Sequence, residues 1–426
     1  MNGLLLLGSL LFLLVIGIPV AYAIGLSGVI FLLITSMRPM VVIPQRLFLG
    51  MDTYVLIAIP LFTLSGYIME CGGMSKRLVD CIEKYFGRMP GSMGTITIVC
   101  CTVFAALTGS GPATVAAIGA IMMPAMLKSG YSKPQSAGLL AAGGALGPVI
   151  PPSICMIVYG CTLNLSIPTM FIASMIPGIL LALVFIAVNI VTVRKNRIVT
   201  VSEKYTFREI ARSTWNASGV LFMPVLVLGG IYGGLFTPTE AAVICVVYCT
   251  VIGIVYKELS LKSFINALEK TVDTSAMIIM IVAMSNIFGW ILSAAQIPTK
   301  IARAVVPLLH SPLLYMVILL IFLFLAGCFM ETLASIVIFG PILVPIGVEL
   351  GIDPLHLGVV FCIALVVGFI TPPFGVNLFT AAGVAKVSFT DVVKGVLPYL
   401  LSAMAVVIFL AFVPEVILWL PNIING

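Results

Sequence analysis

Long apolar runs follow one another along this chain, and short polar segments separate them. A helix needs about 20 apolar residues to cross a membrane. Runs of about that length cover residues 4–20, 22–36, 53–70, 135–163, 168–192, 218–236, 239–256, 273–294, 356–384 and 396–420. We therefore expect an all-α polytopic membrane protein, because a membrane β-barrel would show short segments of alternating polarity instead.

Two further apolar segments, 93–127 and 312–347, are each too long for one crossing and carry a polar break near the middle. In the first, Thr108-Gly109-Ser110-Gly111 interrupts the helical pattern, and Pro112 suits the first turn of a new helix. In the second, the break lies at Glu331-Thr332. We expect two re-entrant helical hairpins. Lipid cannot satisfy the backbone at their tips, so each tip must be buried in protein or line a polar cavity.

A second kind of break interrupts the runs 135–163 and 356–384, where Gly147 and Gly368 each precede a Pro-Pro pair. These breaks recur at one constant spacing of 221 residues. The matched pairs are Pro124 with Pro345, Gly130 with Gly351, Gly147 with Gly368, and Pro151-Pro152 with Pro372-Pro373. The constant spacing predicts an internal repeat. Paired, Gly- and Pro-interrupted apolar segments in two halves point to the binding site of a secondary transporter.

Charge is scarce and unevenly placed. The chain of 426 residues is 61% hydrophobic and 8% charged, whereas soluble domains carry about 25% charged residues. If the loop 194–215 is cytoplasmic, alternating crossings leave only four basic residues on the opposite side: Arg38, Arg46, Lys300 and Arg303. This bias predicts periplasmic termini and two halves inverted relative to each other. The net charge of +6 does not indicate a nucleic-acid partner, because the basic residues lie in short loops.

The breaks and charges together predict a division into a scaffold and two transport halves. Residues 1–75, 166–295 and 386–426 are expected to be scaffold. The transport halves are 91–165 (hairpin 93–127, broken helix 135–163) and 312–385 (hairpin 312–347, broken helix 356–384). Amphipathic stretches at 76–90 and 296–311, centred on Ser75 to Arg88 and Thr299 to His310, are expected to be surface arms that join the two parts. Ordinary solvated loop helices are the alternative.

Oxygen atoms gather at the breaks, and hard cations prefer oxygen ligands. Unwound helices coordinate Na⁺ in transporters, so we predict one Na⁺ near each pair of hairpin tip and broken helix, held largely by backbone carbonyls. The candidates in the first half are Thr108, Ser110, Gly111, Gly147, Pro148, Val149 and Ile150. Those in the second half are Gly327, Cys328, Met330, Glu331, Thr332, Gly368, Phe369 and Thr371. The alternative is that these are helix kinks with structural glycines.

The helix that follows each break presents its N-terminus at membrane depth, where free N–H groups and the positive dipole end suit a carboxylate. The candidate substrate-binding residues are Pro112, Thr114, Ser153, Ser335, Pro373 and Asn377. No Lys or Arg lies inside a predicted span. The charge of an anionic substrate would therefore be met by helix dipoles and co-bound cations, which predicts Na⁺-dependent transport.

Two acidic residues stand out. Glu331, at a hairpin tip, is a functional candidate by default; it is expected to lie near the cation or to contact a partner subunit. Glu240 follows Thr237-Pro238-Thr239 and is expected to cap a helix. Enzyme motifs are missing: the sequence holds no GxxxxGK[ST], no HExxH and no GxSxG.

The motifs together resemble the large (M) membrane subunit of tripartite ATP-independent periplasmic (TRAP) transporters, of the DctM and SiaM type, over nearly the whole chain. The residues that carry the resemblance are Pro60-Leu61-Phe62 with Gly66, Thr108 to Thr114, Gly147 to Ser153, Gly234 to Ala242, Gly327 with Glu331-Thr332, and Thr371 to Asn377.

The resemblance implies an elevator-type, Na⁺-coupled importer of the bacterial inner membrane, with a fold like that of the ion transporter superfamily. It implies organic-acid substrates such as C4-dicarboxylates, sialic acid and other sugar acids. A periplasmic substrate-binding protein (P subunit) would deliver the substrate. A small four-helix membrane subunit (Q subunit) is expected as a separate polypeptide, because the chain begins at its first span.

Two other classes of protein remain as alternatives. A membrane-embedded enzyme would need a polar catalytic group inside the bilayer, such as a pair of His or Asp residues. A channel would need a ring-forming filter and would not explain two unlike kinds of break in inverted repeats.

Overall fold

The computed structural model describes residues 2–35, 39–87, 91–196, 205–305, 307 and 311–425, and every regular element within them is a helix. Nine of the helices in these ranges are long and apolar enough to cross a membrane. Some residues used in the topology prediction lie outside these ranges. Arg38, Arg88 and His310, which served to place loops or the ends of the arms, lie outside the described residues, as do Arg197 and Lys204.

The first half of the chain runs from α1 to α10. Its elements are α1 (Asn2–Val15), α2 (Val20–Thr35), α3 (Val42–Met51), the 3₁₀ turn η1 (Tyr54–Ile57), α4 (Ala58–Cys71), α5 (Met74–Phe86), α6 (Ser92–Thr108), α7 (Gly111–Lys128), α8 (Lys133–Ala145), α9 (Ile154–Leu163) and α10 (Ile167–Lys195). The predicted first hairpin is α6–α7, and the first broken helix is α8–α9.

The second half repeats this order. Its elements are α11 (Phe207–Tyr232), α12 (Pro238–Val255), α13 (Leu261–Ala294), α14 (Ile297–Val305), α15 (Pro312–Phe329), α16 (Thr332–Glu349), α17 (Pro354–Val367), the 3₁₀ turn η3 (Gly368–Ile370), α18 (Val376–Ala385), α19 (Phe389–Phe412) and α20 (Pro414–Asn425). A shift of 221 residues carries the bounds of α7 onto those of α16, and α3, η1 and α4 together onto α13. The repeat therefore extends beyond the hairpins and broken helices.

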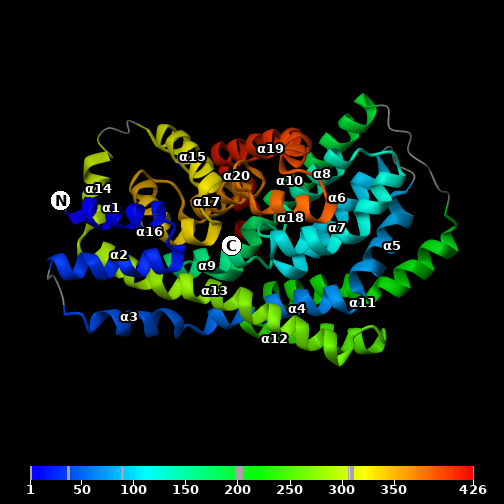
Figure 1. Ribbon diagram of the computed structural model, residues 1–426, viewed down its shortest axis with the longest axis horizontal. Helices are drawn as coiled ribbons and strands as arrows, with labels where there is room; N and C mark the ends of the chain where they lie inside the picture. Colours follow the sequence, from blue (N-terminus) through cyan, green and yellow to red (C-terminus); the bar gives the residue numbers. More distant parts are fainter. Residues whose placement is uncertain are drawn as a thin grey trace.

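Two layers of helices pack against each other (Figure 1). We call α1–α4 and α11–α13 the frame helices; they run along one side of the molecule, with α13 against α2, α3 and α4. We call α6–α10 and α15–α20 the core helices. Hairpin α6–α7 lies toward one end of the long axis and hairpin α15–α16 toward the other, as the predicted inversion requires.

α10 and α19 pack mainly on the core helices. Residues 166–295 and 386–426 were expected to be scaffold. α10 packs on α6, α17, α19 and α20, and α19 packs on α8, α10 and α17, so we group both with the core helices. The division into scaffold and transport halves stays a prediction. The predicted single span 396–420 is also two helices, because α19 ends at Phe412 and α20 begins at Pro414.

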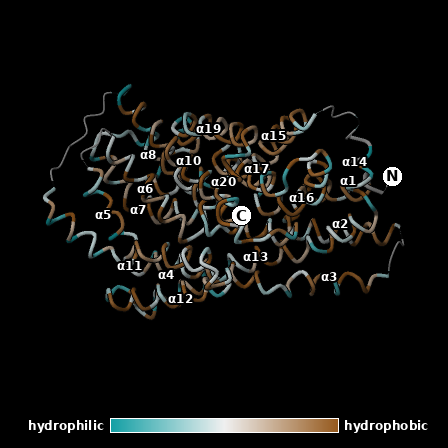
Figure 2. Tube along the Cα trace, turned by 180° about the vertical axis from the view of Figure 1, so that it is seen from behind, coloured by the Kyte–Doolittle hydropathy of each residue, from teal (hydrophilic) through white to brown (hydrophobic). Residues whose placement is uncertain are grey.

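Most of each frame or core helix is apolar, and the polar segments lie mainly toward the two ends of the molecule (Figure 2). Brown, apolar segments fill most of the frame and core helices, and teal segments gather mainly toward the two ends, around α5 and α14. α13 has 34 residues, which at 1.5 Å per residue is about 51 Å and exceeds the roughly 30 Å of a hydrocarbon core. α13 is therefore long enough to cross a membrane and extend beyond it.

The two predicted arms are the helices α5 and α14. α5 buries Leu78, Val79 and Ile82 and packs on α11 and α6, so it joins a frame helix to the first hairpin. α14 likewise contacts α13 and α16. Each of these helices thus contacts one frame helix and one hairpin, and their role as arms stays a prediction.

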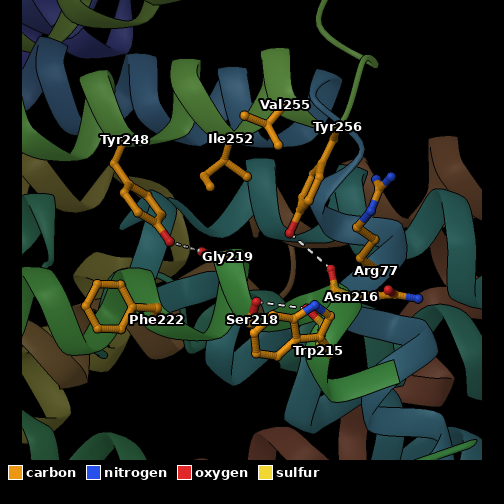
Figure 3. Close-up of a pocket in the computed structure, with 10 residues that line it drawn as sticks. All are labelled: Arg77, Trp215, Asn216, Ser218, Gly219, Phe222, Tyr248, Ile252, Val255 and Tyr256. Carbon is orange, nitrogen blue, oxygen red and sulfur yellow. Dashed lines mark hydrogen bonds between the residues drawn. The ribbon is translucent and has the colours of Figure 1, made fainter. Parts of the chain in front are cut away.

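An arginine fastens α5 to the frame (Figure 3). The Arg77 guanidinium lies 3.9 Å from the Tyr256 ring centroid, and its Nη1 is 2.6 Å from Glu258 Oε1. The groove beside it, about 730 Å³ in volume, runs between α11 and α12, with Phe222 and Tyr248 at its other end. Arg77 thus pairs with Glu258 and stacks on Tyr256, which is consistent with a structural role in holding α5 against the frame.

Glu240 caps α12, as predicted. Its Oε2 accepts a hydrogen bond from the Thr237 N–H at 2.8 Å, and Thr237 Oγ1 accepts from the Glu240 N–H at 3.3 Å. This reciprocal pair satisfies two backbone donors at the helix start. Capping therefore accounts for the carboxylate.

Candidate functional site

The tip of the first hairpin is closed by hydroxyl groups. α6 ends at Thr108, and Gly109 follows in the left-handed region at φ +60°. The Ser110 N–H donates to Thr108 Oγ1 at 3.4 Å, and Thr114 Oγ1 donates to the Ser110 carbonyl at 2.7 Å. The hydroxyl oxygens of Thr108 and Thr114 are 3.2 Å apart. The tip is therefore a compact cluster of oxygen atoms at the junction of α6 and α7.

The linker of the first broken helix, 146–153, is pressed against this tip. A Cβ atom on Gly147 would lie 2.6 Å from the Ser110 carbonyl, and one on Gly109 would lie 2.8 Å from the Pro152 carbonyl. Only glycine permits such close approach of backbone to backbone. Every residue of this linker is buried. The structure thus brings together the predicted first-half candidates Thr108, Ser110, Gly111 and Gly147.

Part of the predicted carbonyl set is already engaged. Ser153 Oγ donates to the Pro148 carbonyl and accepts from the Met156 N–H at 3.4 Å, so it closes the linker and caps α9. The side chains of Val149 and Ile150 face Gly178 of α10. These two residues can offer only their backbone to an ion.

The second hairpin tip also meets its broken helix backbone to backbone, but it carries different side chains. Glu331 is the N-cap of α16, and its Oε2 accepts from the Ala334 N–H at 2.9 Å. Gly327 on α15 and Gly368 in η3 meet backbone to backbone. Thr332 Oγ1 donates to the Leu365 carbonyl at 3.4 Å. The structure therefore brings Gly327, Thr332 and Gly368 together.

The linker of the second broken helix, 371–375, is open where the first is closed. Pro373 and Phe374 are exposed, Phe374 by 59%, and the Phe374 ring lies 6.1 Å from that of Phe329. The carbonyls of Phe369 and Thr371 converge beside Gly375. The Pro-Pro bonds of both linkers are cis.

One side chain of the second half reaches into the first. Asn377, in the first turn of α18, donates from Nδ2 to the Ala141 carbonyl of α8 at 3.2 Å. Its Oδ1 is buried without a hydrogen-bond partner, and a Cβ on Gly111 would lie 2.8 Å from it. A buried amide oxygen without a donor is a suitable ligand atom for a cation. Asn377, predicted to bind substrate, therefore also fits a cation site beside the first tip.

The remaining candidates lie beside one or the other hairpin tip. Pro112 and Thr114 lie at the start of α7 beside the first tip. Ser335, in the first turn of α16, is buried and its Oγ has no partner. Cys328 Sγ donates to the Phe324 carbonyl at 3.0 Å, and Met330 is partly exposed, so neither sulfur is positioned as a hard-cation ligand. The six predicted substrate residues are thus divided between the two half-sites.

Glu331 also faces the frame. It lines a cavity of about 400 Å³ together with Pro19, the start of α2 (20–22) and residues 276, 277, 280 and 281 of α13. The carboxylate therefore lies at the boundary between the second hairpin and the frame helices.

A buried polar network at the base of the first hairpin has no counterpart among the predicted residues. The Tyr131 hydroxyl donates to the Gly91 carbonyl at 3.1 Å and accepts from the Gly94 N–H at 3.2 Å. Asn189 Nδ2, from α10, donates to the Gly91 carbonyl at 3.0 Å. The network ties hairpin α6–α7 to α10. The one amide side chain of α10, Asn189 in the middle of an apolar run, was its signal in the sequence.

The donor atoms available at both half-sites are oxygens. Within the described ranges there is no group of three or more His, Cys, Asp or Glu residues that could hold a metal ion. Carbonyl, hydroxyl and amide oxygens suit a hard cation such as Na⁺ rather than a transition metal.

Comparison with known proteins places the chain in a family. A family model described as the DctM component of the tripartite ATP-independent periplasmic transporter matches residues 7–416. The chain is 39% identical over 404 residues to the isethionate TRAP transporter permease protein DctMQ of Oleidesulfovibrio alaskensis, covering 95% of this chain and 64% of that protein. The chain thus spans just under two thirds of this relative's length.

A second relative matches from end to end. The C4-dicarboxylate TRAP transporter large permease protein DctM of Pseudomonas aeruginosa is 38% identical over 401 residues, with 94% of each chain covered. Among solved structures, the fold is similar to that of the YdaH transporter of Alcanivorax borkumensis, with a TM-score of 0.62 at 14% identity over 86% of this chain and 85% of that one.

The inverted hairpins and broken helices, the family match and the relatives agree. The alternatives of an enzyme and a channel therefore do not apply. The chain belongs to the family of DctM components, the large permease proteins of tripartite ATP-independent periplasmic transporters.

Proposed function

We propose that this protein imports an organic acid across the bacterial inner membrane, coupled to Na⁺ and driven by movement of the core helices against the frame helices. The observation that carries the proposal is the pair of half-sites. Each combines a hairpin tip with a broken helix, and glycine backbones touch at Gly147 and at Gly368. Two such sites in inverted repeats suit alternating access.

Sodium is the coupling ion that the donor set favours. Oδ1 of Asn377 and Oγ of Ser335 are buried acceptors without partners, and unwound backbone surrounds both tips. A cation bound there would also supply positive charge close to the N-termini of α7, α9, α16 and α18. Those helix ends would then hold a carboxylate more strongly, which couples anion binding to Na⁺ binding.

The substrate class follows from the same electrostatics. The relatives compared above are named for isethionate and for C4-dicarboxylates, which are organic anions. Sialic acid and other sugar acids, implied by the sequence motifs, are anions too. A site that meets negative charge with helix dipoles and bound Na⁺ accepts acids of different shape, and the residues around the tips then set the choice.

Two partners complete the proposed transporter. A periplasmic binding protein delivers the acid, and a small four-helix permease extends the frame. Frame helix α12 exposes Val243, Val247, Val251 and Ile254 along one face, spaced as one helical stripe. Such a face suits lipid or the apolar helices of the small permease. Both chain termini are proposed to be periplasmic.

Uptake into proteoliposomes tests the proposal. The chain is reconstituted with its small permease and binding protein, and labelled isethionate, succinate and sialic acid are supplied with and without an inward Na⁺ gradient. We expect uptake of one acid that requires both Na⁺ and the binding protein. Uptake that proceeds equally without Na⁺ would overturn the coupling. Uptake that needs no binding protein would overturn the tripartite assembly.

A further inference from the structure

A polar cavity lies between the frame helices and the core helices, away from both hairpin tips. It has a volume of about 360 Å³. The frame side is formed by α3, η1 and α13, with Arg46, Asn286 and Trp290 in its lining. The core side is formed by the end of α9, with Thr162 and Asn164, and by Pro341 of α16. The cavity therefore opens between the two layers that the proposed function moves relative to each other.

The cavity lies on the predicted outer side of the half-sites. α9 starts at the first linker and α16 starts at the second tip, and both run from there toward the cavity. From Ser153 to Thr162, and from Thr332 to Pro341, the helices advance nine residues. At 1.5 Å per residue this is roughly 14 Å in each case. A solute in the cavity is thus about 14 Å outward from the helix N-termini of both half-sites.

Arg46 is a cation without a carboxylate partner. The ion pairs among the described residues join Arg77 to Glu258 and Lys270 to Glu70, and no Asp or Glu lines the cavity. Arg46 is partly buried, and its guanidinium carbon lies 5.1 Å from the Trp290 ring centroid. Stacking on an indole leaves the edge of the guanidinium, with its N–H donors, free for an anion.

The contrast with Arg77 indicates a different role for Arg46. Both arginines stack on an aromatic ring, but Arg77 is neutralised by Glu258 at 2.6 Å. An ionisable side chain that faces a cavity within a membrane protein, without an opposite charge, is a candidate for a ligand path. Polar groups of Thr162, Asn164, Asn286 and Ser293 surround the same cavity, so an anion there would also find neutral hydrogen-bond partners.

We propose that Arg46 and this cavity form an outer docking site for the acidic group of the transported organic acid. The carboxylate or sulfonate binds the Arg46 guanidinium on the frame before the acid moves inward between the layers to the N-termini of α9 and α16. The inference rests on the proposed function, because it takes the organic acid as the substrate. It adds a fixed cation on the frame to a binding site otherwise built from dipoles and Na⁺.

Arg46→Gln tests the docking site in the reconstituted complex. We expect the concentration of substrate-loaded binding protein at half-maximal uptake to rise about tenfold, in line with loss of one bidentate ion contact. Arg46→Lys keeps the charge but loses the planar fork, so its half-saturating concentration is expected to lie between the two. Arg303→Gln is the matched control, because it removes an exposed positive charge that the sequence places on the same side.

A second readout separates substrate binding from docking of the binding protein. Thermal unfolding of the purified permease complex is followed without binding protein, with Na⁺ alone and with Na⁺ plus whichever of isethionate, succinate or sialic acid the wild type takes up. We expect Arg46→Gln to keep the stabilisation by Na⁺ and to lose most of the additional stabilisation by the acid.

Each result decides between the two proposals. Unchanged half-saturation and unchanged stabilisation by the acid in Arg46→Gln would overturn the docking site and leave the proposed function standing. An equal loss in Arg303→Gln would overturn it too, because general surface charge would then explain the effect. If Arg46→Gln does not fold, Arg46→Lys is the deciding variant. Wild-type behaviour of Arg46→Lys would overturn the claim that the acidic group binds the planar edge of the Arg46 guanidinium. Wild-type protein that takes up none of the three acids would overturn the proposed function itself.

Discussion

The two half-sites share a backbone plan and differ in how they are closed. In the first, the linker 146–153 is buried throughout, and Ser153 bonds back to Pro148. In the second, Pro373 and Phe374 are exposed. The matched residues also differ: Ser110 is the N-cap of α7, and Glu331, 221 residues later, is the N-cap of α16.

The difference teaches that the repeat preserves backbone contacts more than side-chain chemistry. Gly111 approaches the Gly144 carbonyl in the first half, and at the matched positions Thr332 donates to the Leu365 carbonyl. The same junction of hairpin and broken helix is therefore made by a bare backbone in one half and by a hydroxyl in the other. One half-site is sealed, and the other is accessible from its surroundings.

The largest expected effect on Na⁺ affinity comes from adding a Cβ atom where the hairpin tip and the broken helix meet backbone to backbone. Gly147→Ala puts a Cβ 2.6 Å from the Ser110 carbonyl, and in Gly368→Ala the Cβ meets Gly327. Backbone cannot yield as a side chain can, so each change should cost roughly 1–3 kcal/mol and lower Na⁺ affinity by about 10- to 100-fold. Na⁺-dependent thermal stabilisation of the complex measures this.

Gly383→Ala serves as the control for these two variants. It lies in α18, and nothing is within 4 Å of its Cβ position. Alanine there should stabilise the helix by roughly 0.5–1 kcal/mol and leave Na⁺ affinity unchanged. Wild-type Na⁺ binding in Gly147→Ala would show that the close junction is not part of the ion site.

A smaller effect is expected at the side chain that joins the halves. Asn377→Ala removes the bond to the Ala141 carbonyl and the unpartnered Oδ1. We expect Na⁺ affinity to fall about tenfold, as for loss of one ligand atom worth about 1.4 kcal/mol. Isothermal titration with Na⁺ in detergent measures this directly.

Ser335→Ala is the comparison for Asn377→Ala in the second half. Ser335 Oγ has no partner to lose, so the change should leave stability without Na⁺ nearly unaltered. Any fall in Na⁺ affinity then reports a ligand role. Two variants that both bind Na⁺ as the wild type does would remove these oxygens from the ion sites.

The smallest effect on transport is expected from cysteines that probe accessibility. Phe374→Cys should react with a polar maleimide at least about tenfold faster than Ile150→Cys, because Phe374 is 59% exposed and Ile150 is 7% exposed. Peptide mass spectrometry separates these sites from the native cysteines, of which Cys71, Cys161 and Cys328 are partly exposed. Equal labelling of both positions would contradict the asymmetry of the linkers.

The sequence predicted the parts of the fold that glycine and proline punctuate. Glycine and proline mark the breaks in the helices, and the constant spacing of Gly147 and Pro151-Pro152 from Gly368 and Pro372-Pro373 revealed the repeat before any contact was known. The closeness of Ser110 to Gly147 also followed, because two breaks at one membrane depth must satisfy each other's backbone.

Other features left no such mark. α3 was missed because Pro44 and Arg46 interrupt a short apolar run, and with it the cavity that Arg46 lines. The contacts of α10 and α19 with the core helices could not be predicted, because a helix that is apolar all round does not show which neighbours it packs against. The Tyr131–Asn189 contact joins residues 58 positions apart, which no local pattern reports.

The unequal frame has a consequence for the energies of the two end states. α13 is one continuous helix, whereas its counterpart is divided into α3, η1 and α4. Two identical inverted halves would simply exchange roles when the core moves, so the inward and outward states would match in intrinsic free energy. This equality is lost when one half has the continuous helix α13 and the other has the divided segment α3, η1 and α4. The two end states of the empty protein therefore differ in intrinsic free energy, and ligands act by changing their populations.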